Sequence, residues 1–316
     1  MGSKDWRKHS NIQCFLDATA PFVASQAQSK TSRRDSNGRW QLIDKDTIEC
    51  FTLGDLWDQY YEWSAYGLGV PIHLPTGENV VQYYVPHLSA IQIYTTKPPL
   101  SRNVVEDSES DSWSDDSESE RLSKSWDAAS DDSGFEPDGL CPAKDRIGQL
   151  YLQYVEYCPP YARVPLTEKV TELAQSYPGL TSFKSVELSP ASWMSISWYP
   201  IYHIPARKNV KDLSSCFLTY HTISTSFQDQ MPSDSEKDTL SPTFEESAKR
   251  CEDNIYCVSL PSFALATYKM QRTFWANPLM GDNERLVSLY TAAKSWLKQL
   301  GVHHHDFNFF STHSSM

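Results

Sequence analysis

Few residues of this chain combine a reactive type with a spacing that could support catalysis. His203 and His221 fall on two segments that we predict to pair as a β-hairpin, and Cys216 belongs to the second segment. A cysteine beside a histidine can act as a nucleophile, so these three residues are weak catalytic candidates. We favour the other interpretation, in which each histidine is a hydrogen-bonded structural residue of an aromatic strand.

The most conspicuous group of potential metal ligands is the run His303-His304-His305-Asp306. Consecutive side chains of an extended chain point in opposite directions, so three neighbouring histidines do not converge on one ion. The sequence also contains no phosphate-binding loop, dinucleotide-binding glycine motif, G-x-S-x-G or H-E-x-x-H pattern. We therefore expect no dedicated metal site and no cofactor, and we regard an enzyme as the less favoured class.

The negative charge of the chain is concentrated in residues 106–138. This segment holds thirteen acidic residues, ten serines and two basic residues, a net charge of −11, whereas the whole chain carries −12. Such a composition cannot bury a core and predicts disorder. The rest of the chain is nearly neutral, so nucleic-acid binding is disfavoured electrostatically.

The acidic segment has features of a regulated docking site. Serines with an acidic residue three positions later suit acidophilic, casein-kinase-type enzymes, and each phosphate adds about −1.5 to −2 charges. The serines that fit are Ser108, Ser112, Ser117 and Ser133, with Ser233 and Ser235 in a later segment. Aromatic rings in such a segment favour a motif that buries a ring in a partner protein, and the candidates are Trp113, Trp126 and Phe135. The competing interpretation is an inert linker.

Hydrophobic periodicity predicts an α+β fold, with a mainly antiparallel sheet and flanking helices. The clearest helix signals are a capping pattern at Thr52 and an apolar stripe over residues 283–300. The best strand pair is 192–204 with 214–224, and Pro200 predicts that the first strand is bent or lies at a sheet edge. Aromatic residues make up 13% of the chain, and we expect most of them in the core. Further strands are expected at 80–84, 88–95, 149–157, 255–260 and 262–270, and a further helix at 165–177.

These elements predict a single domain formed by residues 11–100 and 141–310. A flexible N-terminus, residues 1–10, precedes it. A disordered, acidic and serine-rich insertion (101–140) and a second polar loop (228–248) interrupt it.

The sequence also bears on the compartment. No run approaches the roughly 18–20 apolar residues that span a bilayer, and the N-terminus lacks the apolar stretch of a signal peptide. Seven scattered cysteines without a C-x-x-C motif predict reduced thiols. We expect a soluble protein of the cytoplasm or the nucleus.

Five blocks of sequence carry a family resemblance: FTLGDLWD (51–58), EWSAYGLGVP (62–71), VQYYVPHLS (81–89), WMSISWYPIY (193–202) and CFLTYH (216–221). Together they resemble the plant proteins grouped as domain of unknown function 789. The resemblance implies one plant-type domain interrupted by variable acidic loops, and it supplies no catalytic residues.

Two functions follow as hypotheses. The leading one is a non-enzymatic, intracellular interaction or regulatory protein whose acidic, phosphorylatable loop engages a protein partner. The alternative is an enzyme or small-molecule-binding protein with a pocket near the hairpin of residues 192–224, lined by the two histidines and the cysteine named first. The sequence identifies no partner, ligand, pathway or oligomeric state.

Overall fold

The computed structural model of the protein describes residues 9–29, 47–95, 147–201, 214–225 and 256–313. The described residues form one compact unit. Residues 1–8 of the predicted flexible N-terminus (1–10), the acidic insertion and the second polar loop lie outside the described residues. Ser10 is the N-cap of the helix that begins at Asn11.

The centre of the unit is a six-stranded antiparallel sheet, which confirms the predicted α+β class. The long strand β4 (Asn79–Thr95) pairs with β3 (Leu68–His73) near its start and with β5 (Gln149–Val155) near its end. On its other side β4 pairs with β6, and the order continues to β7 and β9. These strands are Trp193–Pro200, Cys216–Thr222 and Ala264–Tyr268.

A second, three-stranded sheet has the order β2-β1-β8. Its strands are β1 (Phe22–Ser29), β2 (Thr47–Cys50) and β8 (Tyr256–Ser259), all antiparallel. The two strands predicted at 255–260 and 262–270 therefore belong to different sheets. Pro261 separates them, because the chain leaves β1 beyond Leu260, whose N–H still donates to the carbonyl of Pro21.

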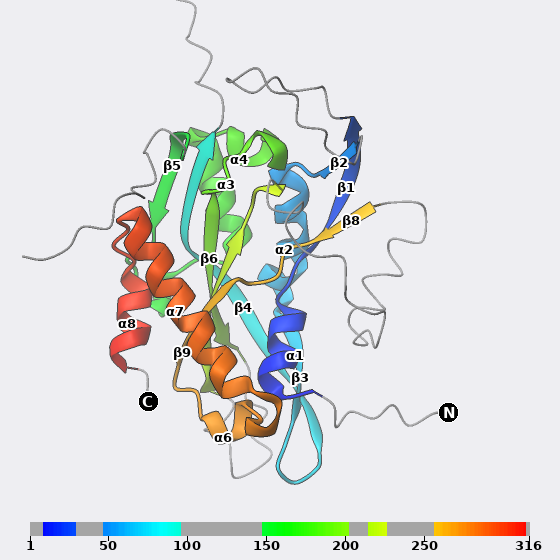
Figure 1. The fold of residues 1–316 in the computed structure, drawn as a ribbon, viewed down its shortest axis with the longest axis vertical. Helices are drawn as coiled ribbons and strands as arrows, with labels where there is room; N and C mark the ends of the chain where they lie inside the picture. The colour runs from blue at the N-terminus through cyan, green and yellow to red at the C-terminus, as the bar shows by residue number, and fades with distance from the viewer. Residues whose placement is uncertain (1–8, 30–46, 96–146, 202–213, 226–255, 314–316) are drawn as a thin grey trace, which may run out of the picture. The chain divides into compact units, whose positions relative to one another are not determined.

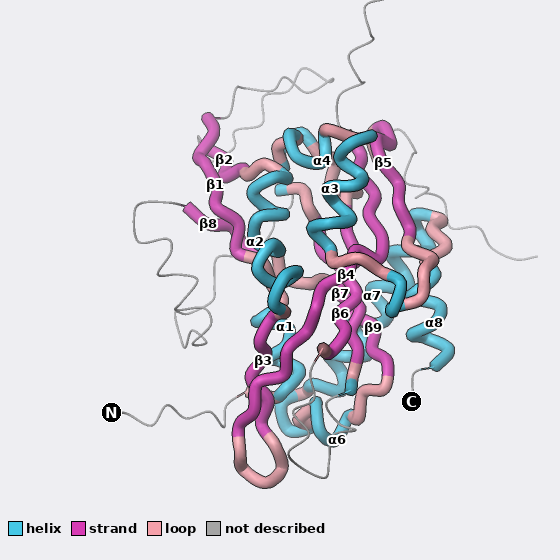
Figure 2. Tube along the Cα trace, turned by 180° about the vertical axis from the view of Figure 1, so that it is seen from behind, coloured by secondary structure: helices cyan, strands magenta, loops and turns pink. Residues whose placement is uncertain are grey.

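Helices cover both faces of the main sheet, as Figures 1 and 2 show from opposite sides. We call the two sides the α2 face and the α8 face. The α2 face carries α1 (Asn11–Ala18), α2 (Leu53–Tyr66), α3 (Leu166–Ser176) and α4 (Gly179–Ser182). The α8 face carries α7 (Asp282–Leu300) and α8 (His305–His313). Short elements complete the fold: α6 (Arg272–Trp275), η3 (Pro160–Ala162), η4 (Ser185–Glu187) and η7 (Pro278–Met280).

Local sequence explains why α2 begins and ends where it does. The Thr52 side chain accepts from the backbone N–H of Asp55, and the Asp55 carboxylate accepts from the N–H of Thr52 at 2.8 Å. This capping box confirms the predicted helix start. Gly67 ends the helix at a φ of 82°, a conformation that favours glycine. Its missing side chain also matters, because a Cβ there would lie 2.7 Å from Ile201.

The core of the α2 face is aromatic, as expected from the composition. Phe15, Tyr84, Trp198, Phe217 and Trp275 are all fully buried. Phe15 stacks on Phe217 with a centroid distance of 4.0 Å and meets the other rings edge-on. Such pairs add stabilisation beyond the area that they bury.

Three sequence-based boundaries were wrong. The strands predicted at 80–84 and 88–95 are one strand, which runs through Pro86. The strand that holds Pro200, β6, is not an edge strand, because it lies between β4 and β7; Pro200 is its last residue and pairs only with Tyr84 of β4. The residues after Gly301 were not expected to be helical, yet they form α8. Within the described residues, no helix combines the length and apolar character needed to cross a membrane.

Candidate functional site

Cys216 and His221 both lie on β7, but on opposite faces of the main sheet. Cys216 belongs to the apolar cluster under α7 and α8, and its neighbour Phe217 belongs to the cluster under α1 and α2. His221, four residues after Phe217, shares the face of Phe217 because strand side chains alternate. The structure therefore does not bring the cysteine and the histidine together. His203 lies outside the described residues.

His221 is fully buried and hydrogen-bonded at both ring nitrogens. Its Nδ1 lies 2.8 Å from the carbonyl oxygen of Leu260, which only accepts, so Nδ1 carries the proton. Its Nε2 lies 2.9 Å from the Thr219 hydroxyl, which in turn accepts the indole N–H of Trp198 at 3.0 Å. Burial lowers the pKa of His221 to about 4, so the ring is neutral near pH 7. Both ring nitrogens of His221 are therefore occupied by hydrogen bonds within the core.

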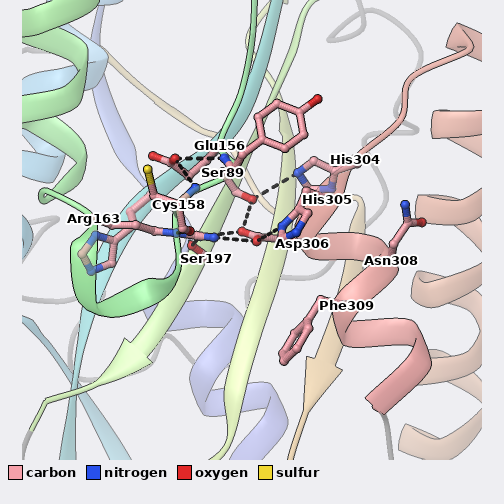
Figure 3. A network of polar contacts seen from close by, with 12 residues as sticks. Ser89, Glu156, Cys158, Arg163, Ser197, His304, His305, Asp306, Asn308 and Phe309 are labelled. Carbon is pink, nitrogen blue, oxygen red and sulfur yellow. Dashed lines mark hydrogen bonds and ion pairs between the residues drawn. The ribbon is translucent and has the colours of Figure 1, made fainter.

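A second polar cluster lies on the α8 face and starts from an irregularity in β4. The pairing of β4 with β6 steps from Leu88 to Ala90, so that Ser89 forms a bulge. A bulge redirects a side chain relative to the regular pleat. The Ser89 hydroxyl donates to Oδ2 of Asp306 at 2.5 Å and lies 3.1 Å from Nε2 of His304. Figure 3 shows this contact between the middle of β4 and the start of α8.

Arg163 completes the cluster from the segment between β5 and α3. Its guanidinium binds both carboxylate oxygens of Asp306, at 2.6 and 2.7 Å. Both side chains are almost inaccessible, with 2% and 4% of their surface exposed. The Nε–H of Arg163 donates to the carbonyl of Cys158 at 2.8 Å, so the arginine also fixes the segment that precedes it. Bidentate pairs of this kind set both distance and orientation.

Glu156 holds the same segment from its other end. One carboxylate oxygen accepts the backbone N–H groups of Tyr157 and Cys158, at 2.9 and 2.8 Å. The other accepts the hydroxyl of Tyr154 at 2.7 Å. Burial raises the pKa of Glu156, but these hydrogen bonds outweigh it, so its pKa lies below the usual value. The residues between Glu156 and Arg163 are thus fixed at both ends.

The hydrogen bonds define where the protons lie. Ser89 donates to Asp306, so it accepts from Nε2–H of His304, and Nδ1 of that ring accepts from the Tyr220 hydroxyl at 2.9 Å. Burial lowers the pKa of His304 to about 4, which makes the ring neutral. Burial also raises the pKa of Asp306, but the hydrogen bonds and charge of Arg163 outweigh it and keep the carboxylate ionised.

The cluster contains the residue types of a serine hydrolase triad, but its connections differ. In a triad the carboxylate orients the histidine, and the histidine accepts the serine proton. Here the carboxylate of Asp306 accepts the serine proton, and His304 donates to the serine. Ser89, His304 and Asp306 are also 3% exposed or less, so a substrate has no access to the hydroxyl. This arrangement serves to hold α8 and the Arg163 segment against β4.

The profile of the family described as "protein of unknown function (DUF789)" matches residues 10–310. The chain belongs to the DUF789 family. Comparisons with curated proteins and with solved structures each found no significant match. The matched range covers every described helix and strand except the last three residues of α8.

In this DUF789 protein the three histidines of the C-terminal run separate. His304 is buried in the cluster, and His303 and His305 lie at the surface. No group of three or more histidine, cysteine or acidic residues suited to a metal ion occurs within the described ranges. Sequence reasoning missed the role of His304 because it treated the run as extended, whereas a helix begins at His305.

A groove on the described part of the DUF789 fold is lined by residues near the start of α1, the end of β3 and α6, away from the predicted hairpin pocket. It has a volume of about 360 Å³ and is open to solvent. Asn11 lines it, and its side chain bonds the backbone of His73 and Phe274 at 2.7 to 3.0 Å. Neither Cys216 nor His221 lines it.

The cysteines agree only in part with the expected reduced state. Cys14, Cys50, Cys158 and Cys216 are free thiols. Cys257 is disulfide-bonded, which contradicts the expectation for that residue. The remaining predicted site residues lie outside the described ranges: the phosphorylation candidates Ser108, Ser112, Ser117, Ser133, Ser233 and Ser235, and the docking candidates Trp113, Trp126 and Phe135.

Proposed function

We propose that this DUF789 protein is a non-enzymatic interaction or regulatory protein whose folded unit presents an acidic segment to a partner. The observation that carries the proposal is the attachment of that segment to the sheet. Thr95 and Gln149 are paired at the adjoining ends of β4 and β5. Residues 106–138, with a net charge of −11, lie between them in sequence. The connection that contains the charged segment therefore begins and ends at two hydrogen-bonded strands.

The proposed regulation is phosphorylation of the acidophilic serine sites. Four phosphates in residues 106–138 would add about −6 to −8 charges, which strengthens attraction to a basic partner. Trp113, Trp126 and Phe135 are the proposed anchors, because buried aromatic rings dominate the affinity of many interfaces.

The buried polar groups support a non-enzymatic role. His221 and His304 are neutral, bonded at both nitrogens and inaccessible. An enzyme or small-molecule-binding protein built on the 192–224 hairpin needs polar groups that converge on an accessible pocket. Neither His221 nor Cys216 meets that need, so the alternative gains no support from them.

The proposed setting is a plant cell, in the cytoplasm or the nucleus. The plant source rests on the sequence blocks that resemble the family. The compartment rests on the four free cysteines among the described residues. The disulfide at Cys257 argues for an oxidising compartment, so fractionation of cells expressing the tagged protein is the direct test.

Affinity capture compares the wild-type chain with a deletion of residues 106–138. We expect the deletion to lose a defined set of partners, because it removes the charge and the three aromatic anchors together. An unchanged set of partners would overturn the proposal.

A length-matched control separates the effect of the segment's charge on binding from the effect of having a segment of that length. In this variant the thirteen acidic residues of 106–138 become asparagine or glutamine, and the aromatic residues stay. We expect it to bind as weakly as the deletion if charge dominates. Circular dichroism of each variant checks that the folded unit is intact.

A further inference from the structure

Among the described strands, β5 forms an edge of the main sheet. It pairs with β4 on one side, and Figures 1 and 2 both show it at the border of the sheet. The N–H of Glu156 donates to the carbonyl of Ser89 at 2.8 Å, so by alternation the backbone groups of Gln153 and Val155 point away from β4. Within the described residues, no hydrogen bond to these outward groups is formed. An unpaired row of this kind is a template for a further strand.

The other edges of the same sheet are protected. Strand β3 contains Pro71 and packs against α1, and β9 is five residues long, is followed by Lys269 and packs against α7 and α8. Proline, lysine, short strands and covering helices all prevent strand addition. Strand β5, with the sequence QLYLQYV, has neither a charge nor a proline. Of the three edge strands, only β5 therefore lacks such protection.

A rigid aromatic anchor follows directly after the open strand. Tyr157 is 62% exposed and Tyr161 is 91% exposed. The segment between them is held at its ends by Glu156 and by Arg163, which is itself fixed by Asp306. A ring presented by a preorganised segment costs less ordering entropy on binding.

The charge of the chain that precedes β5 in sequence decides which occupant fits the edge. Residues 106–148 carry a net charge of −10 and lead directly into Gln149. Asp138 precedes Gln149 by eleven residues, and that stretch of chain reaches up to roughly 35 to 40 Å, beyond the length of the strand. A second copy would bring two such segments together, and a nucleic acid has the same sign of charge. A basic peptide is attracted.

We propose that β5 receives an extended, lysine- or arginine-containing segment of a partner protein, which adds to the main sheet as its next strand. The inference rests on the proposed interaction function and names its surface. Backbone hydrogen bonds to Gln153 and Val155 supply the pairing, the acidic segment supplies the electrostatic attraction, and Tyr161 supplies an aromatic contact.

The test uses the full chain and a synthetic eight-residue peptide of alternating lysine and valine. Its matched control has the same sequence and charge but is N-methylated at alternate residues, which removes the donors on one edge. We expect the parent peptide to bind at least tenfold more tightly by fluorescence anisotropy. We also expect it to slow amide hydrogen exchange at Gln153 and Val155. Equal binding of the two peptides, without protection in β5, would overturn the inference.

Protein variants test the same surface without altering the strand. Tyr161→Ala should weaken peptide binding severalfold. Tyr66→Ala, which removes a ring that is 78% exposed on α2, should not. Equal loss in the two variants would contradict the role of Tyr161.

The outcomes also separate this inference from the proposed function. If only the function fails, deletion of residues 106–138 leaves the captured partners unchanged, and the parent peptide still protects β5. If only the β5 inference fails, the deletion loses partners but the two peptides bind alike. Protection of β5 in the absence of peptide, with a concentration-dependent dimer in sedimentation, would overturn the inference in favour of a second copy.

Discussion

The two faces of the main sheet are held by different kinds of interaction. On the α2 face, rings from α1, β4, β6 and β7 form a continuous aromatic core around Phe15 and Trp198. On the α8 face, the C-terminal helix is tied to the sheet by the buried pair of Arg163 and Asp306, in addition to its apolar contacts. Burial of apolar area is tolerant of small shifts, whereas a bidentate ion pair is satisfied in one geometry.

This difference suggests a division of roles. The α2 face supplies most of the stabilisation, because aromatic side chains bury large areas. The polar cluster defines where α8 and the Arg163 segment lie, since a buried pair is a weaker source of net stability than its Coulomb energy suggests. The two kinds of face should therefore respond differently when one residue is removed and when a pair is replaced.

The largest effect is expected from Trp198→Ala on the α2 face. Trp198 is fully buried and packs near Phe15, Tyr60 and Trp63. Truncation leaves a large cavity, so we expect a loss of about 5 kcal/mol in the free energy of unfolding, measured by urea denaturation. Trp198→Phe keeps most of the volume and should cost clearly less. A loss of under about 2 kcal/mol in the alanine variant would mean that the core collapses around the site.

On the α8 face, Arg163→Met should cost about 3 to 5 kcal/mol, because it leaves the Asp306 carboxylate buried without its cation. The matched variant is the double replacement Arg163→Met with Asp306→Leu. We expect it to be more stable than the single variant, since no charge of the pair is left buried without its partner. If instead the double variant is the less stable of the two, the pair contributes net stability and the proposed division of roles is wrong.

The start of α2 could be read from the sequence far better than the polar cluster of the α8 face, for a physical reason. The start of α2 depends on Thr52 and Asp55, which are three residues apart, so local pattern reveals it. The polar cluster joins Asp306 to Arg163 and Ser89, which precede it in the sequence by 143 and 217 positions. No local pattern marks the bulge that aims Ser89 at α8. Pairing over such distances depends on the sheet register, which the sequence alone does not define.

The smallest effect compared here is a pH dependence shared by both faces. His221 on the α2 face and His304 on the α8 face each have a pKa lowered by burial to about 4. The unfolded chain binds these protons near pH 6.5 and the folded chain does not. The stability that depends on the two neutral histidines is therefore fully present above pH 6.5. It falls as the pH is lowered toward 4, by about 1.4 kcal/mol per pH unit for each histidine.

Between pH 6.5 and pH 4 each histidine should lower the free energy of unfolding by about 3 kcal/mol, which is a large part of a typical folding free energy. Urea denaturation at several pH values measures the slope for the wild type and for His221→Asn and His304→Asn separately. Each substitution should reduce the slope by one proton, whatever its effect on stability at pH 7. Equal reductions would show that both histidines stay unprotonated in the folded state, although one lies in a mainly aromatic core and the other beside an ion pair. A reduction in the His221 variant alone would mean that the Asp306 carboxylate lets His304 take up a proton in the folded state.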